Sequence, residues 1–185
     1  MAKFYDELNA DLRTFIAEQQ LFFVASAPTN GGHVNLSPKG LDSLRILSDQ
    51  HVAWLNLTGS GNETAAHVIE NGRMTIMFCS FTKQPLILRL YGKARVVHPR
   101  DSEWQAQYSR FPPNPGARQI YILQIESVQT SCGFSVPFYE FQSDRNTLTQ
   151  WAEKRGDEGI RQYWEERNQT SLDGLPTDIL ETNNK

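Results

Sequence analysis

The sequence has few of the features that mark several large classes of protein. It contains only 2 cysteines in 185 residues, too few for a disulfide framework, and their separation matches no spacing typical of metal ligands. No apolar run approaches the ~20 residues that a membrane-spanning helix needs. The opening MAKFYDELNADLRTF carries acidic groups and lacks the apolar core of a secretory signal. These absences predict reduced thiols, a cytoplasmic location, no bound metal and no membrane partner.

An excess of charge of one sign is also missing. Lys and Arg number 18 against 21 Asp and Glu, a net charge of -3, and the basic residues are scattered along the chain. Such a sequence has no electrostatic footprint for nucleic acid. Hydrophobic residues make up 39% and charged residues 21%, which is typical of a globular domain of this length with a real core. We therefore expect a single domain over residues 1–185.

The spacing of apolar residues predicts a mainly β structure with helices at its ends. Residues 4–20 have apolar side chains at helical spacing. Six segments rich in β-branched and aromatic residues then predict strands: LFFVASAP, HVNLSP, HVAWLNLT, RMTIMFCSF, LILRLYGKARVV and QIYILQIESVQ. Because helices do not alternate regularly with these strands, the order favours a small antiparallel barrel over a doubly wound sheet. The barrel is expected at about 21–142.

Short helices are expected at about 62–71 and in DSEWQAQYSRF, and a helical tail is expected at about 144–185. The apolar residues of the tail predict its buried face: Leu148, Trp151, Ile160, Tyr163 and Trp164.

The stretch LTGSGNET, residues 57–64, joins a predicted strand to a predicted helix. Ser60 and Glu63 match a capping box, in which the two side chains satisfy free amides at a helix start. The same free amides and the helix dipole also favour an anion, and Gly59 and Gly61 would let the backbone approach it closely. The stretch is neither a Walker A loop nor a dinucleotide fingerprint. A helix cap and a phosphate site are therefore both open.

Basic residues elsewhere are candidates for neutralising a phosphate. The segment NLSPKGLDSLRIL contains Lys39 and Arg45 beside serines, and two cations near a hydroxyl-rich helix start would suit a dianion. The alternative for each is a solvated strand edge. Arg89 lies inside the apolar LILRLYG, where a buried charge needs a partner. Its alternative is a salt bridge to Glu63 or Glu70.

Four segments carry a family resemblance: FFVASAP, VNLSPKG, HVAWLNLTGSGNETAAHVIENGRMTIMF and ILRLYGKARVV. They resemble the pyridoxamine 5'-phosphate oxidase-like flavoproteins of the FMN-binding split-barrel superfamily. GSGNETAAH, SPKG and CGFSVP together resemble one branch of bacterial and fungal proteins, and the resemblance extends to NQTSLDGLP, nearly the full chain. It implies a mainly β (α+β) fold, a six-stranded antiparallel split β-barrel with flanking helices. It also implies a homodimer with FMN at the subunit interface.

The resemblance further implies which residues contact the cofactor. SPKG would supply Ser37, Lys39 and Gly40 beside the flavin ring and ribityl chain. The following loop would surround the phosphate with Thr58, Ser60, Gly61, Asn62 and Thr64. Where the pyridoxamine phosphate oxidases have Ser-Arg-Lys, this chain has Gly-Asn-Glu, so the expected positive charge shifts to Lys39, Arg45 or Arg89. The ending DGLPTDILETNNK lacks their tryptophan and arginine signature, and vitamin B6 oxidation itself is not expected.

Two functions follow from this resemblance. The first is an FMN-dependent oxidoreductase that acts on a small molecule, with NADH or NADPH as candidate reductant. No side chain is assigned to catalysis, because in such enzymes the isoalloxazine performs the electron transfer. The alternative is a non-catalytic split-barrel module that binds FMN, deazaflavin or haem as a carrier or sensor.

Overall fold

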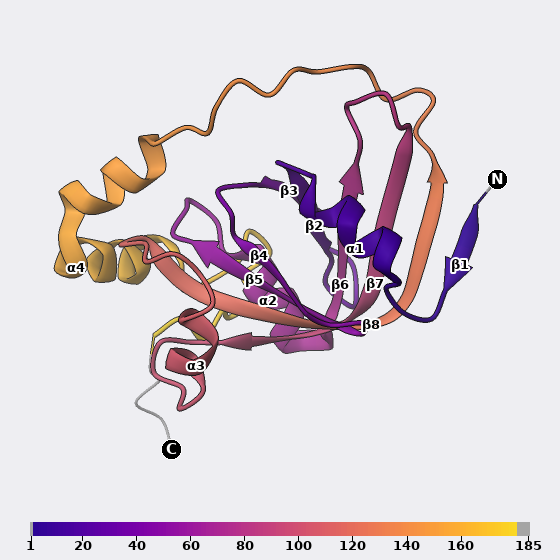
Figure 1. Cartoon of the computed structure of the whole chain (residues 1–185). Helices are drawn as coiled ribbons and strands as arrows, with labels where there is room; N and C mark the ends of the chain where they lie inside the picture. The colour runs from indigo at the N-terminus through magenta and orange to yellow at the C-terminus, as the bar shows by residue number, and fades with distance from the viewer. Residues whose placement is uncertain (1, 181–185) are drawn as a thin grey trace.

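A curved antiparallel sheet dominates the computed structural model, which describes residues 2–180 (Figure 1). The strands pair in the order β3-β2-β6-β7-β8-β5-β4, and β1 pairs with β8. The eight strands are β1 (Lys3–Tyr5), β2 (Phe22–Ser26), β3 (Asn35–Lys39), β4 (Leu44–Ser48), β5 (His51–Leu57), β6 (Arg73–Cys79), β7 (Leu86–Val97) and β8 (Ala117–Cys132). The edge strands β3 and β4 do not pair with each other, so the sheet curves without closing. This arrangement confirms the predicted split barrel.

The sheet has two more strands than the six predicted. β4 forms a hairpin with β5, in which Leu44 lies opposite Trp54. β1 replaces the start of the predicted first helix: Phe4 pairs with Gln129 of β8 and remains exposed. Helix α1 (Ala10–Ala17) begins only after Asn9, whose side chain accepts a hydrogen bond from the Leu12 amide at 2.9 Å.

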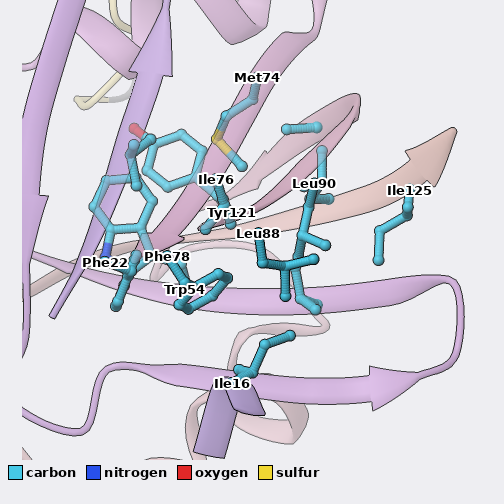
Figure 2. Close-up of a cluster of buried hydrophobic side chains, with 14 of the residues drawn as sticks. Ile16, Phe22, Trp54, Met74, Ile76, Phe78, Leu88, Leu90, Tyr121 and Ile125 are labelled. Atoms are coloured by element: carbon cyan, nitrogen blue, oxygen red, sulfur yellow. The ribbon is translucent and has the colours of Figure 1, made fainter. Parts of the chain in front are cut away.

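The buried hydrophobic side chains form a large main core and a smaller cluster that includes Leu55 and Phe111. Figure 2 shows the aromatic centre of the main core, where Trp54 and Tyr121 stack with ring centroids 4.8 Å apart and Phe22 meets the Trp54 ring edge-on. Ile16 of α1 packs against this cluster. The alternation of buried and less buried residues along β7 places Leu88 and Leu90 in the same core. Trp54 therefore has a fixed position from which it lines a cavity described below.

The long hairpin of β7 and β8 has a bulge at Tyr91 and Gly92. A Cβ added to Gly92 would lie 1.9 Å from the carbonyl oxygen of Gln124. Only glycine fits where the two backbones approach this closely.

Three helices complete the structure: α2 (Glu63–Asn71), α3 (Trp104–Tyr108) and α4 (Thr147–Arg167). Residues 133–146 form an extended segment that arches from the end of β8 to α4 (Figure 1). No helix within residues 2–180 is long and apolar enough to span a membrane.

The predicted buried face of the tail is partly wrong. Ile160 is buried, but Trp151, Tyr163 and Trp164 are only half-buried, and Leu148 is exposed. The helical path breaks at Gly156, which has φ 65° and ψ 175°, so residues before and after it do not share one face. The predicted tail also runs to residue 185, and its last five residues lie outside the described part of the chain.

Candidate functional site

A polar cavity of about 300 Å³ lies between β3, β5 and the start of α2. Alternate residues of β3 face it, because successive side chains of a strand point to opposite sides. Its lining includes six residues of the predicted site: Ser37, Lys39, Ser60, Gly61, Asn62 and Thr64. The other lining residues are Asn35, Trp54, Asn56, Leu57, Gly59, Glu63 and Arg118, whereas the predicted Gly40 lines a neighbouring space. The structure therefore brings the SPKG segment and the 58–64 loop together, as expected from the sequence.

The capping box predicted at the start of α2 is wrong. The helix is preceded by Asn62 rather than Ser60, and no side chain caps it. Ser60 is exposed, and the Glu63 carboxylate accepts a hydrogen bond from the Leu172 amide at 2.8 Å instead of turning back to the cap. The helix ends at Asn71, as the expected range 62–71 predicts: Gly72 has φ 72° and its amide donates to the Val68 carbonyl. The first amides of α2 are thus left without side-chain acceptors.

Arg118 is the site residue that the sequence analysis missed. It begins the β8 segment RQIYILQ, and its side chain is 3% exposed. One guanidinium nitrogen, Nη1, donates to Asn168 Oδ1 at 2.8 Å and to the Gly59 carbonyl at 3.4 Å, whereas Nε has no partner in the described structure. Burial lowers the pKa of Arg118 to about 10. The sequence pattern that could have identified Arg118 is the one noted for Arg89: a single cationic residue within or beside an apolar strand.

Lys39 supplies the second cation of the cavity. Its ammonium group lies 5.1 Å from the centroid of the Trp54 ring. Burial, followed by the positive charge of Arg118, lowers the pKa of Lys39 to about 8. Within residues 2–180 neither Lys39 nor Arg118 has a carboxylate in an ion pair. The cavity therefore contains two positive charges that repel each other, and a bound anion would stabilise both.

Smaller polar groups complete the lining. Asn35 donates to the Thr64 hydroxyl at 3.1 Å, and Ser37 donates to Asn35 at 3.3 Å. Thr58 differs from the prediction in its role: its hydroxyl donates to the Gly116 carbonyl and accepts from Trp164 Nε1, both at 3.0 Å. Through these two hydrogen bonds, Thr58 holds the loop in place.

Two predicted cations lie outside the cavity. Arg45 forms two hydrogen bonds with the Asp42 carboxylate, at 2.7 and 2.8 Å, and lies 5.0 Å from the centroid of Phe111. Arg89 donates to Ser131 at 3.2 Å and is paired with neither of the two glutamates proposed for it. Of the three cations expected to balance the phosphate, the structure places only Lys39 in the cavity.

Residues near the end of α4 hold the 58–62 loop in place through hydrogen bonds. Asn168 is fully buried and donates through Nδ2 to the Gly59 carbonyl at 3.1 Å, while its own carbonyl accepts from Asn62 at 3.3 Å. Together with the Trp164 bond to Thr58, these contacts fix residues 58–62 from positions more than 100 residues away. We call these contacts the C-terminal clamp.

An open antiparallel barrel defines a split-barrel protein, and its polar cavity at the start of α2 holds Lys39 and Arg118. The chain belongs to the pyridoxamine 5'-phosphate oxidase family, whose sequence profile matches residues 8–132. It is 41% identical to the pyridoxamine 5'-phosphate oxidase family protein ustO of Aspergillus flavus, over 95% of this chain and 78% of that protein.

Solved structures share the fold at low sequence identity. HupZ of Group A Streptococcus is 21% identical with a TM-score of 0.51, and the match covers 65% of this chain and 91% of HupZ. A pyridoxamine 5'-phosphate oxidase homologue from Lactobacillus delbrueckii is 20% identical with a TM-score of 0.52, covering 67% of this chain and 94% of its own. These similarities support the architecture alone.

Proposed function

We propose that the protein binds FMN, with the phosphate in the cavity at the start of α2, and acts as an FMN-dependent oxidoreductase on a small molecule. The observation that carries the proposal is Arg118, a buried guanidinium with no carboxylate partner within residues 2–180, beside Lys39. A buried cation needs a compensating charge, and a phosphate dianion at an uncapped helix start would supply it.

The polar groups of the cavity fit the rest of such a ligand. Buried donors at Arg118 Nε and Trp54 Nε1 have no acceptor in the described structure, and the buried acceptor Asn62 Oδ1 has no donor. The phosphate and ribityl hydroxyls of FMN offer acceptors and donors of these kinds. A bound FMN would supply reversible acceptance of electrons, while the protein binds, orients and shields it. In the pyridoxamine phosphate oxidases an Arg-Lys pair lies in this loop. In this proposal, Lys39 of β3 and Arg118 of β8 supply the two positive charges instead.

The function is tested by isolating the protein and adding a reductant. We expect a yellow protein with flavin absorption that bleaches when NADH or NADPH is added and recovers in air. Riboflavin should bind more weakly than FMN, because it lacks the phosphate that Lys39 and Arg118 would contact. Protein that binds FMN but is not reduced would leave cofactor binding in place and contradict the oxidoreductase proposal. A Soret band in place of flavin absorption would contradict both.

The proposal includes a homodimer in which a second copy completes the FMN site. Within the arching segment 133–146, four aromatic side chains are more than half exposed: Phe134, Phe138, Tyr139 and Phe141. Such a concentration of exposed apolar surface is typical of an interface. We expect sedimentation to give a dimer that retains FMN. A monomer that keeps its FMN on dilution would contradict the shared site.

A further inference from the structure

A second, larger cavity of about 660 Å³ lies between the barrel and α4. Most of its exposed surface is apolar, and its apolar and aromatic side chains are Leu21, Leu41, Phe141, Leu148, Trp151 and Tyr163. Polar and charged residues also line it, among them Gln20, Asp144 and Arg145. Cavities of this size that are apolar with few polar groups are typical of small-molecule sites.

The aromatic wall of this cavity is built by the break in α4. Trp151 and Tyr163 are twelve positions apart, which in a straight helix would separate them by about 18 Å. Instead their ring centroids are 5.1 Å apart in an edge-to-face arrangement, at 79°. The left-handed conformation of Gly156 between them turns the chain and allows this contact. Arg155 lies 5.1 and 5.3 Å from the two ring centroids and steadies the pair.

The aromatic cavity is continuous with the polar cavity. A smaller space of about 260 Å³ joins them: it shares Lys39 and Trp54 with the polar cavity, and Leu41 and Leu148 with the aromatic one. Gly59 lines all three. A molecule against Trp151 would therefore lie at the far end of the cleft that begins at Arg118.

A strained turn holds the wall opposite α4. Leu41 and Asp42, in the turn between β3 and β4, have φ angles of 62° and 52°. A bulky residue such as leucine rarely adopts this left-handed conformation, because its side chain crowds the backbone. The ion pair of Asp42 with Arg45 helps to fix the turn, and Leu41 lines both the aromatic cavity and the connecting space. Backbone strain of this kind is concentrated at ligand sites.

We propose that the aromatic cavity binds a neutral, planar aromatic molecule, which is the substrate class of this protein. The role of this molecule as a substrate rests on the proposed flavin function, whereas its binding rests on the shape and lining of the cavity. An uncharged planar ring system matches an apolar lining and can contact the fixed faces and edges of Trp151 and Tyr163. Trp151 and Tyr163 lie beyond residues 8–132, which match the family profile.

The experiment compares two ligands and three variants by calorimetry on the FMN-loaded protein. We expect 2-naphthol to bind at least about tenfold more tightly than decahydro-2-naphthol, which has the same skeleton without aromaticity. Trp151→Ala should weaken 2-naphthol about tenfold, and Trp151→Phe should recover most of the loss. Trp104→Ala is the control, because Trp104 is also half-buried and stacked on a tyrosine, Tyr108, but lies outside the cavity.

The outcomes separate this proposal from the flavin proposal. Absence of 2-naphthol binding, equal affinity for the saturated alcohol, or an unchanged affinity in Trp151→Ala would overturn the aromatic site. FMN content is read independently from absorbance in each sample. If the protein takes up no FMN but flavin-free protein still binds 2-naphthol through Trp151, the aromatic site stands and the flavin function fails.

Discussion

Arg118→Met is expected to lower the affinity for FMN about a hundredfold while affecting riboflavin much less. A charge-assisted hydrogen bond contributes on the order of 1.5–3 kcal/mol, and the upper part of that range corresponds to about a hundredfold in affinity. Arg118 is almost fully buried, so its interaction with a phosphate would be weakly screened by solvent. Affinities of both flavins, measured by quenching of flavin fluorescence, give the ratio that isolates the phosphate.

The control for this experiment is Arg45→Met. Arg45 is another arginine, but it pairs with Asp42 outside the cavity, so FMN affinity should fall far less than in Arg118→Met. If Arg45→Met instead produces the larger loss, the phosphate lies elsewhere and Arg45 regains the role expected from the sequence. Removing Arg118 also removes its bonds to Asn168 and Gly59. An equal loss for FMN and riboflavin would therefore assign Arg118 to loop structure instead of phosphate binding.

The second large effect is a loss of FMN affinity in alkaline solution. The pKa of Lys39 is lowered to about 8 in the folded protein, so its ammonium group loses its proton as the pH rises through that value. If the phosphate requires the charged form, FMN affinity should fall about tenfold between pH 7 and pH 9. The second phosphate ionisation is near pH 6, so the ligand remains a dianion throughout. Riboflavin should show no such decrease.

Deprotonation of Lys39 affects the stability of the flavin-free protein in the opposite direction: FMN affinity falls as the pH rises, whereas the free energy of unfolding increases. The unfolded chain holds the Lys39 proton with the ordinary pKa of 10.5, more tightly than the folded chain. The contribution of Lys39 to the free energy of unfolding therefore rises from about pH 8 to 10.5. Lys39→Met should remove both pH dependences. If that variant retains the alkaline loss of FMN affinity, a group other than Lys39 is responsible.

Much of the fold was predictable because each strand carries its own local pattern. Runs such as LILRLYGKARVV have β-branched and apolar residues that fit a sheet, and the structure places β7 across that same run. The start of the chain was less predictable. Phe4 fits the helical spacing of Leu8 and Leu12, yet pairing with β8 makes it part of a strand, and that contact spans more than 100 residues.

Part of the candidate cavity was predictable because its residues lie in segments with recognisable motifs. Lys39 and the 58–64 loop were expected together through the family resemblance, and both line the cavity. Arg118 was missed because its role depends on a contact between β8 and the loop, which no local spacing reveals. The capping box failed for a similar reason: Glu63 binds the amide of Leu172, a partner more than 100 residues away that the motif alone does not include.

The C-terminal clamp also sets the order in which the protein matures during synthesis. The loop at 58–62 leaves the ribosome early, but Asn168, which binds Gly59 and accepts from Asn62, is made more than 100 residues later. At the usual elongation rates of about 5–20 residues per second, the barrel has several seconds to fold before that partner exists. If the protein binds FMN as proposed, the nascent barrel would thus hold it only weakly until residues 164–168 emerge. Cofactor loading would then be a late, post-translational step.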